Sequence, residues 1–456
     1  MDDKKLTSDL RRPWAFTDRP LPRLVLRPLK SFLDTEASGG ILLLVAAVAA
    51  LLWVNSPWGD SYEELWHTTL TVRLGDLVIS EDLRHWINDA LMAIFFFVVG
   101  LEIKRELVSG ELRDPRAAAL PAFAALGGMI GPALIYAAIN AGGPGSDGWG
   151  IPMATDIAFA VGVLALVGRR APASLKLFLL SLAIVDDIGA ILVIALFYTD
   201  SVSFYALGVA AALLLLIVGL QRAYVRAMPV YAVVAAGVWL AVFESGVHAT
   251  IAGVVLGLMT PASPFQPPQA VSTHARRIAD ETSDDPAEAA EDVHHWLSLS
   301  SLSREAVAPL GRLEHLLHPW TSFVIVPLFA LANAGVDLRG GGIGDAVANP
   351  VALGIIVGLV AGKIIGISSF AWLSTKIGLT RLPSGVRWSH IIAVSSVAGI
   401  GFTVSLFIAA LAFSDADTLE AAKVGILLAS VLAGILGAVL MLRASRRASE
   451  KAPNNG

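Results

Sequence analysis

The chain has 456 residues, of which 55% are hydrophobic and only 16% charged, with a formal net charge of −5. This balance leaves too little polar surface to cover a soluble protein of this size, so the composition indicates a membrane protein. The slightly acidic charge argues against a basic surface for nucleic acid. Because the chain has no cysteine, it has no disulfide, haem thiolate or zinc thiolate site.

A charged, proline-rich arm over residues 1–33 precedes a series of apolar runs that recur as far as about residue 442. Many runs reach the roughly 20 residues that a helix needs to cross the hydrocarbon core. We interpret them as about twelve transmembrane helices, the first eight within residues 34–260 and the last four within 313–444, followed by a tail over 445–456. The first run ends at Asn55-Ser56-Pro57-Trp58 without a cleavage pattern, so we expect it to remain in the chain.

Positive charge alternates along the loops that join these runs. Residues 1–33 are rich in Lys and Arg, the next loop is acidic around Glu63 and Glu64, and the chain ends on a basic segment that contains Arg446 and Arg447. Because Lys and Arg concentrate in cytoplasmic loops, this pattern predicts that both termini lie in the cytoplasm. An even number of spans also requires that the two termini lie on the same side of the membrane.

One long segment outside the apolar runs occupies residues 261–312. Its first part, over 261–303, is rich in Pro, Ser, Asp and Glu and has too few apolar residues to build a core. We expect a mobile cytoplasmic loop. Its acidic stretch over 280–292 is interpreted as a solvated spacer, with a regulatory or partner-binding segment as the alternative.

Several ionisable side chains lie inside apolar runs, where each charge costs about 2.5 to 3.5 kcal/mol on insertion scales. The adjacent acids of LAIVDDIGAILVIALF project about 100° apart around a helix, so they face different surroundings. One is free to line an ion path while the other pairs with a buried base. The alternative is that these groups only pin helices together. The five residues are Asp89, Asp156, Asp186, Asp187 and Lys363.

Two spans contain residues that disfavour a continuous helix. Gly148, Gly150 and Pro152 predict a break near Ala154-Thr155, and small and hydroxyl residues surround Gly399 and Gly401. The predicted topology makes the two spans antiparallel, which is typical of inverted repeats over about residues 117–198 and 350–444. Glycines that only allow close helix packing are the alternative.

Seven sequence blocks in order resemble the NhaA family of bacterial sodium/proton antiporters over nearly the whole chain. The blocks are INDALMAIFFFVVGLEIKREL from Ile87, ATDIAFAVGVLAL from Ala154, LAIVDDIGAILVIALFYT from Leu182, SGVHATIAGV from Ser245, LEHLLHPW from Leu313, VAGKIIGI from Val360 and AGIGFTVSLF from Ala398. The resemblance implies an all-α fold of twelve spans with two crossed, discontinuous helices. It also implies an outer hairpin that joins two copies into a homodimer.

The resemblance further implies residue roles. Asp187 is the main carrier of cation and proton, Asp186 pairs with Lys363, and Asp156 and Thr155 lie beside the site, so sodium binds at Asp187, Asp156 and Thr155. Asp89 matches an acid of the cytoplasmic funnel. The positions linked to pH response are Glu102, Arg105, Glu106, His248, Glu314, His315 and His318. From the residues alone, a histidine such as His248 is more often structural than a pH sensor, and the GLEIKRE charges would ordinarily form a solvated helix end.

The sequence therefore predicts a secondary transporter of the bacterial inner membrane, with no resident cofactor and no nucleic-acid partner. We expect it to export cytoplasmic sodium, and lithium as well, in exchange for protons, with net charge movement and regulation by pH. Carboxylate and hydroxyl oxygens suit a hard cation such as sodium. The alternatives are a sodium-coupled organic-anion symporter of related fold and an intramembrane aspartyl protease.

Overall fold

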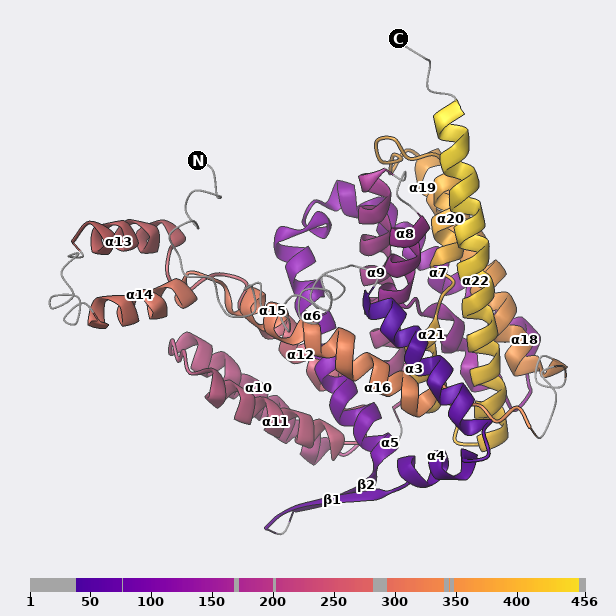
Figure 1. The fold of residues 1–456 in the computed structure, drawn as a ribbon, viewed down its shortest axis with the longest axis horizontal. Coiled ribbons are helices and arrows are strands. Elements are labelled where there is room, and N and C mark those ends of the chain that lie inside the picture. Colours follow the sequence, from indigo (N-terminus) through magenta and orange to yellow (C-terminus); the bar gives the residue numbers. More distant parts are fainter. Residues whose placement is uncertain are drawn as a thin grey trace, which may run out of the picture.

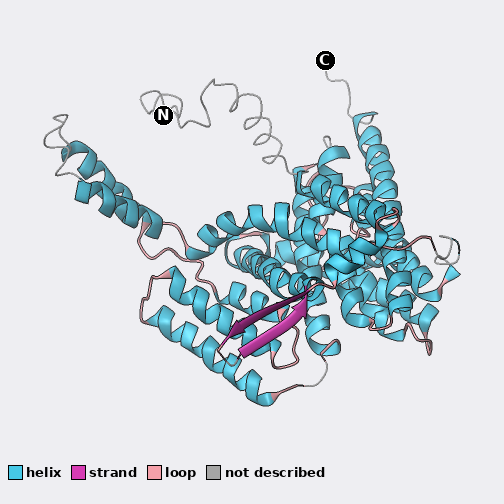
Figure 2. Cartoon of the chain, turned by 60° about the horizontal axis from the view of Figure 1, so that its bottom comes forward, coloured by secondary structure: helices cyan, strands magenta, loops and turns pink. Residues whose placement is uncertain are grey.

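The computed structural model describes residues 38–75, 77–167, 172–199, 202–281, 293–339, 344 and 348–450. The described part is mainly α-helical, with one two-stranded antiparallel hairpin (Figures 1 and 2). The predicted arm over 1–33, most of the acidic stretch over 280–292 and residues 451–456 of the predicted tail lie outside the described residues.

The first described helix, α3 (Ser38–Val54), is apolar throughout and is followed after a 115° bend by the short helix α4 (Gly59–Trp66). Strand β1 (Thr69–Leu74) then pairs antiparallel with β2 (Leu77–Asp82), with Thr69 opposite Asp82. Gly75 lies at the turn with a φ of +63°, a conformation that favours glycine. The hairpin extends from the lower end of the molecule in Figure 1.

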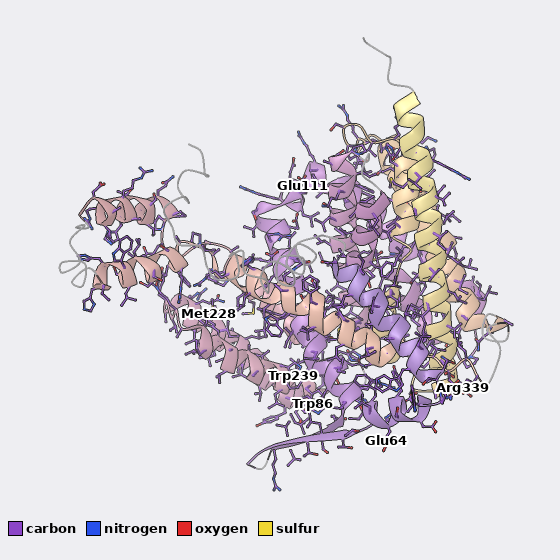
Figure 3. The ribbon with its side chains drawn as sticks, in the orientation of Figure 1. Glu64, Trp86, Glu111, Met228, Trp239 and Arg339 are labelled. Atoms are coloured by element: carbon purple, nitrogen blue, oxygen red, sulfur yellow. The ribbon has the colours of Figure 1, made fainter. Side chains whose placement is uncertain are left out.

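A continuous helical stretch of 27 residues follows the hairpin. It consists of α5 (Leu83–His85), the π-helical turn η3 (Trp86–Leu91) and α6 (Met92–Ser109), and the short 3-10 helix η4 (Glu111–Arg113) comes next. The Asp82 carboxylate begins the stretch by accepting a hydrogen bond from His85 N at 2.7 Å. The ring of Trp86 stacks on that of Trp239, with centroids 6.4 Å apart (Figure 3).

Two sets of helices share one order, a long helix, a bent pair and a second long helix. The first set is α7 (Pro115–Asn140), η5 (Ser146–Met153) with α8 (Ile157–Val167), and α9 (Ala173–Phe197). The second is α18 (Pro350–Val357) continued by η7 (Gly358–Gly362) and α19 (Lys363–Lys376), then α20 (Trp388–Val397) with α21 (Phe402–Ala412), and α22 (Ala416–Glu450). The bent pairs turn by 40° and 49°. Both predicted breaks, near Ala154-Thr155 and at Gly399 to Gly401, are confirmed.

The two sets pack closely because glycines line the contact between α7 and α19. A Cβ atom on Gly127 would lie 2.2 Å from the carbonyl oxygen of Gly366, so a larger residue there would force the helices apart.

The remaining apolar helices pack beside these two sets. They are α10 (Phe204–Arg222), α11 (Met228–Phe243), α12 (Thr250–Met259), and α15 (Pro309–Trp320) continued by η6 (Thr321–Ile325) and α16 (Val326–Asn333). Helices α10 and α11 form an antiparallel pair with a small apolar core that includes Ala210, Ile217 and Val238 (Figure 1).

The segment that we expected to be a mobile loop contains two helices, α13 (Pro268–Glu281) and α14 (Val293–Glu305). They pack against each other and extend sideways from the bundle (Figures 1 and 2). The low apolar content of 261–303 did not indicate them because a pair of helices needs few apolar side chains. Val271 and Ile278 of α13 supply two of these.

Seven helices in the described residues are long and apolar enough to cross a membrane, and the number rises to ten if each of three bent pairs is one span. Large apolar side chains are exposed around them, for example Leu196 at 73% and Leu215 at 71%. An apolar outer surface of this extent is typical of a membrane protein.

Candidate functional site

The two helix breaks lie against each other in the middle of the molecule. The backbone N–H of Asp156 donates to the carbonyl oxygen of Ile400 at 2.7 Å. Gly401 permits this approach, because a Cβ atom there would lie 3.2 Å from the carbonyl oxygen of Ala154 in the first break. Backbone groups that each break removes from its own helix are therefore satisfied in part by the other chain segment.

The Asp156 carboxylate lies at the N-terminal ends of two helices. Its Oδ1 accepts from Phe159 N of α8 at 3.0 Å, and its Oδ2 accepts from Thr403 N of α21 at 3.1 Å. The Thr403 hydroxyl donates to the same Oδ2 at 2.6 Å. A helix N-terminus carries a partial positive charge, so one buried carboxylate neutralises both half-helices.

Lys363 lies at the opposite, C-terminal kind of helix end. Its ammonium group donates to the carbonyl oxygen of Met153, the last residue of η5, to Thr155 Oγ1 at 3.0 Å and to Asp186 Oδ2 at 2.6 Å. These three bonds use all the hydrogens that an ammonium carries. The side chains of Lys363 and Asp186 are both fully buried, so this is an ion pair shielded from solvent.

Thr155 lies between the ion pair and the second break. Its hydroxyl oxygen is 2.7 Å from Asp186 Oδ2 and 2.8 Å from the carbonyl oxygen of Ala398, and it donates its one hydrogen to one of these acceptors. Asp186 Oδ1 is buried without a hydrogen-bond partner in the described part of the chain. The Asp186 carboxylate therefore keeps unused acceptor capacity.

The Asp187 carboxylate differs from its neighbour in having no hydrogen-bond partner among the described residues, although only 6% of Asp187 is exposed. The two adjacent acids of α9 therefore have separate surroundings, as their 100° separation predicts. One is held by Lys363 and Thr155, and the other is available to a ligand.

A second group of charges lies along α6 and α15. The Arg105 guanidinium contacts the Glu106 carboxylate at 3.5 Å and pairs with the Glu314 carboxylate. Glu102 is close enough to Glu314 and to Asp187 to interact with both electrostatically. Part of the predicted pH-response set is therefore assembled, and Glu102 connects it to the central acids.

Other members of the predicted pH-response set lie elsewhere. His248 contacts the carbonyl oxygen of Tyr198, whereas His315 and His318 are exposed on α15. Asp89, which was expected in a cytoplasmic funnel, does not lie with the other members of this set. Asp89 lies in η3, near the hairpin, about 20 Å along the same helix from Glu102 at 1.5 Å per residue.

Thr403 is the main site residue that the sequence did not single out, although its hydroxyl and N–H both bind the Asp156 carboxylate. Ser405 likewise donates to the carbonyl oxygen of Ile151 at 2.8 Å. The one feature of the sequence that points to these two residues is that both carry a hydroxyl group and directly follow the second break. The partner atoms are about 250 positions away in the sequence, so no local pattern identifies which hydroxyl meets which acid.

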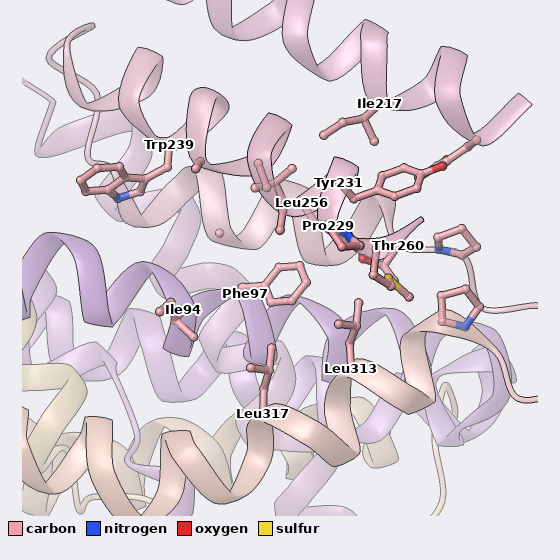
Figure 4. A pocket seen from close by; sticks show the side chains of 18 of the residues that line it. Ile94, Phe97, Ile217, Pro229, Tyr231, Trp239, Leu256, Thr260, Leu313 and Leu317 are labelled. Atoms are coloured by element: carbon pink, nitrogen blue, oxygen red, sulfur yellow. Dashed lines mark hydrogen bonds between the residues drawn. The ribbon is translucent and has the colours of Figure 1, made fainter. Parts of the chain in front are cut away.

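An apolar cavity of about 670 Å³ lies apart from the central acids, between α10 to α12 and the facing helices α6 and α15 (Figure 4). Its wall includes Phe97, Trp239 and Leu313 and contains no acidic side chain. A cation has no carboxylate ligand there, so this cavity is not the ion site.

The apolar outer surface, the two meeting helix breaks and the buried charges between them define a polytopic helical membrane protein with a charged centre. Comparison with known proteins identifies the family to which it belongs. The sequence profile of the family described as "Na+/H+ antiporter 1" matches residues 30–441.

Curated relatives align over nearly their whole length. A Sorangium cellulosum protein named Na(+)/H(+) antiporter NhaA 2 is 48% identical over 436 residues, which cover 94% of this chain and 93% of the relative. The Na(+)/H(+) antiporter NhaA of Rhodopirellula baltica is 49% identical over 420 residues, 91% of this chain and 94% of the relative. The chain belongs to the Na+/H+ antiporter 1 family, the NhaA antiporters, whose members are transporters rather than enzymes.

Proposed function

We propose that this protein exports cytoplasmic sodium across a bacterial inner membrane in exchange for protons. The observation that carries the proposal is the buried Asp187 carboxylate, without a hydrogen-bond partner in the described chain, beside an Asp186 that Lys363 already neutralises. The family membership supports the same activity, because its relatives are named sodium/proton antiporters.

Competition for one carboxylate accounts for the exchange. A buried, uncompensated carboxylate is costly, so Asp187 holds either a proton or a cation and not both. Sodium would therefore be held by the Asp187 carboxylate together with Thr155, Asp156 and backbone oxygens at the breaks, which are the hard ligands that it prefers.

The bent helix pairs suit a site that opens alternately to the two sides of the membrane. We propose that the two sets of helices are inverted repeats whose discontinuous helices cross at Asp156 and Lys363. With α11 and α12 counted beside the seven long helices and three bent pairs, the fold reaches twelve spans. Both chain ends would then lie in the cytoplasm, as the distribution of Lys and Arg predicts.

We further propose that more than one proton enters for each sodium ion that leaves. Each extra positive charge that moves inward gains about 2.3 kcal/mol per 100 mV of membrane potential. The Lys363 ammonium is a candidate second proton carrier, since it can release a proton if Asp186 changes partners. Lithium, a similar hard cation, is the expected second substrate. Regulation by pH would act through Arg105, Glu106 and Glu314, with Glu102 as the link to Asp187.

Proton movement in proteoliposomes tests the site. The parent protein should collapse an imposed pH gradient when sodium or lithium is added and should not respond to potassium. Asp187→Asn should abolish the response, because an amide neither releases a proton nor compensates a cation. Glu64→Gln, an exposed acid of α4, is the matched control and should behave as the parent does.

Either of two results would contradict the proposal. Full activity of Asp187→Asn would move the ion site away from α9. A parent protein that moves no protons with any cation, but takes up an organic anion with sodium, would favour the symporter alternative.

A further inference from the structure

The insert formed by α13 and α14 is tied to the end of two membrane spans. The Arg226 guanidinium donates a hydrogen bond at 2.6 Å to the carboxylate of Glu305, the last residue of α14, and also lies 5.7 Å from the centroid of the Phe265 ring. Arg226 follows the end of α10, and α15 begins at Pro309 only four positions after α14 ends. Both α10 and the helix that begins with α15 are apolar enough to cross a membrane. The C-terminal end of α14 is therefore held at the level of a membrane surface.

Helix α14 carries apolar side chains on a face that the protein leaves open. Val293, Trp296 and Leu297 are 50%, 47% and 63% exposed, and their spacing puts them on one side of the helix. The half-buried Leu299 and Leu302 lie on the other side. Helix α13 packs along α14 and accounts for the half-buried side (Figure 1). A pair of helices that lies in water has no need of a second apolar face.

The open face continues into a basic cavity of about 650 Å³. Ser300, Ser303 and Arg304 of α14 form one wall, and Arg312 and His315 of α15 form another, with no acid among the lining residues. Arg312 Nε is buried without a hydrogen-bond partner in the described part of the chain. Guanidinium and hydroxyl donors around an open cavity are the chemistry that recognises a phosphate group.

We propose that α14 is an interfacial helix that binds the anionic surface of the surrounding bilayer. Val293, Trp296 and Leu297 enter the boundary between headgroups and acyl chains, and Arg304 and Arg312 hold a lipid phosphate in the cavity. A helix that lies in the interface buries its apolar face by about 5 to 10 Å, and tryptophan is enriched at that depth. We favour the lipid surface over a protein partner because of where the two walls of the cavity lie. The C-terminal end of α14 and the start of α15 are both held where spans leave the membrane.

The absence of cysteine makes the test direct, since any introduced cysteine is the only labelling site. Leu297→Cys and the neighbouring, exposed Ser298→Cys would each carry a nitroxide spin label in the full-length protein. Each would be reconstituted into vesicles of phosphatidylcholine alone or of phosphatidylcholine and phosphatidylglycerol in equal parts. Collisions with oxygen, which partitions into lipid, and with a water-soluble nickel complex report the depth of the label.

In the anionic vesicles the label at position 297 should show a several-fold higher ratio of oxygen to nickel collisions than the label at 298. The ratio should fall in phosphatidylcholine alone and in high salt, which screens the arginine contacts. Arg304→Gln with Arg312→Gln should reduce it as well, and Arg276→Gln with Arg277→Gln on α13 is the matched control for loss of two charges.

Three outcomes would overturn the proposal. Equal exposure of both labels to the nickel complex would leave α14 in water. Shielding of position 297 from both reagents would mean that protein, such as a second copy of this chain, covers the face. The same depth in both kinds of vesicle would remove the anionic headgroup as the ligand.

Discussion

At the scale of single residues, the centre of the molecule contains a buried ion pair between Lys363 and Asp186. Lys363 is fully buried, and its three hydrogen-bond acceptors come from α9 and from the first break. A buried ion pair contributes little net stability compared with apolar residues of the same shape, but removal of one partner leaves the other uncompensated. Each of the two charges is therefore tolerated in the interior only while the other is present.

Lys363→Ala should lower the free energy of unfolding by about 3 to 5 kcal/mol, because Asp186 is left buried and unpaired. Thermal unfolding in detergent measures the change. The double variant Lys363→Met with Asp186→Asn should recover much of the loss, since it removes both charges. Lys376→Ala, on the exposed end of the same helix, is the control and should change stability by about 1 kcal/mol or less. A Lys363→Ala protein as stable as the parent would contradict this account.

At the scale of helices, the two breaks depend on the shape of the backbone as much as on charge. Gly399 lies where the second break approaches η7, and it has no space for a side chain. The helix ends that result are the ends that Asp156 and Lys363 neutralise. A change in the approach of the two segments therefore alters the ion site without touching an acid.

Gly399→Ala should reduce sodium-driven proton movement by at least tenfold while the protein still assembles in the membrane. The added methyl group would lie 2.3 Å from the Leu359 carbonyl oxygen, which belongs to backbone and cannot move aside cheaply. Gly434→Ala on α22 is the matched control, because its methyl group would meet only Ile400 Cδ1 at 3.6 Å. Equal transport by the two variants would show that the close approach at Gly399 is not required.

The N-terminus of α22 offers a prediction about pH. Asp415 Oδ2 accepts from the Thr418 hydroxyl at 2.6 Å and from Thr418 N at 2.9 Å, and these bonds hold the pKa of Asp415 below its usual range. A depressed carboxyl pKa stabilises the fold above the pKa of the unfolded chain, and this contribution is lost as pH falls through the folded pKa.

Asp415→Ala should therefore melt at a lower temperature than the parent at neutral pH, and the difference should shrink as the solution is acidified below the ordinary aspartate range. Asp415→Asn keeps an oxygen acceptor without the charge, so its difference from Asp415→Ala should vary much less with pH. Melting curves over a pH series provide the measurement. A constant deficit of Asp415→Ala down to strongly acidic pH would argue against an ionised cap.

At the scale of the whole molecule, the β hairpin extends from one end of the protein and leaves apolar side chains exposed (Figure 1). It has two strands, and Leu70, Val72 and Val78 are 45%, 47% and 50% exposed. An isolated two-stranded hairpin is marginally stable in water, and exposed strand edges pair readily with other strands. We propose that a second copy of this chain supplies the missing contact and forms a homodimer.

Replacement of residues 69–82 by a short Gly-Ser linker should shift the purified protein from dimer to monomer, with activity retained in each copy. Mass measurement of single particles in detergent or nanodiscs gives the two populations. Substitution of Leu70 and Val72 by threonine, which keeps β propensity, should weaken the dimer less. A dimer that is unaffected by loss of the hairpin would place the contact elsewhere.

The sequence by itself determined the membrane class, the family, both helix breaks and the central set of acids with their lysine. The family is recognised from seven blocks along the whole chain. The other features are local, because apolar length, helix-breaking residues and an acid in an apolar run are each visible within about 20 positions. The tertiary structure decided that the Thr403 hydroxyl completes the Asp156 site and that the two helix breaks lie against each other. It also showed that 261–305 contains two packed helices. Those outcomes depend on contacts between segments up to about 250 residues apart and on which helix faces meet, and no local pattern encodes either.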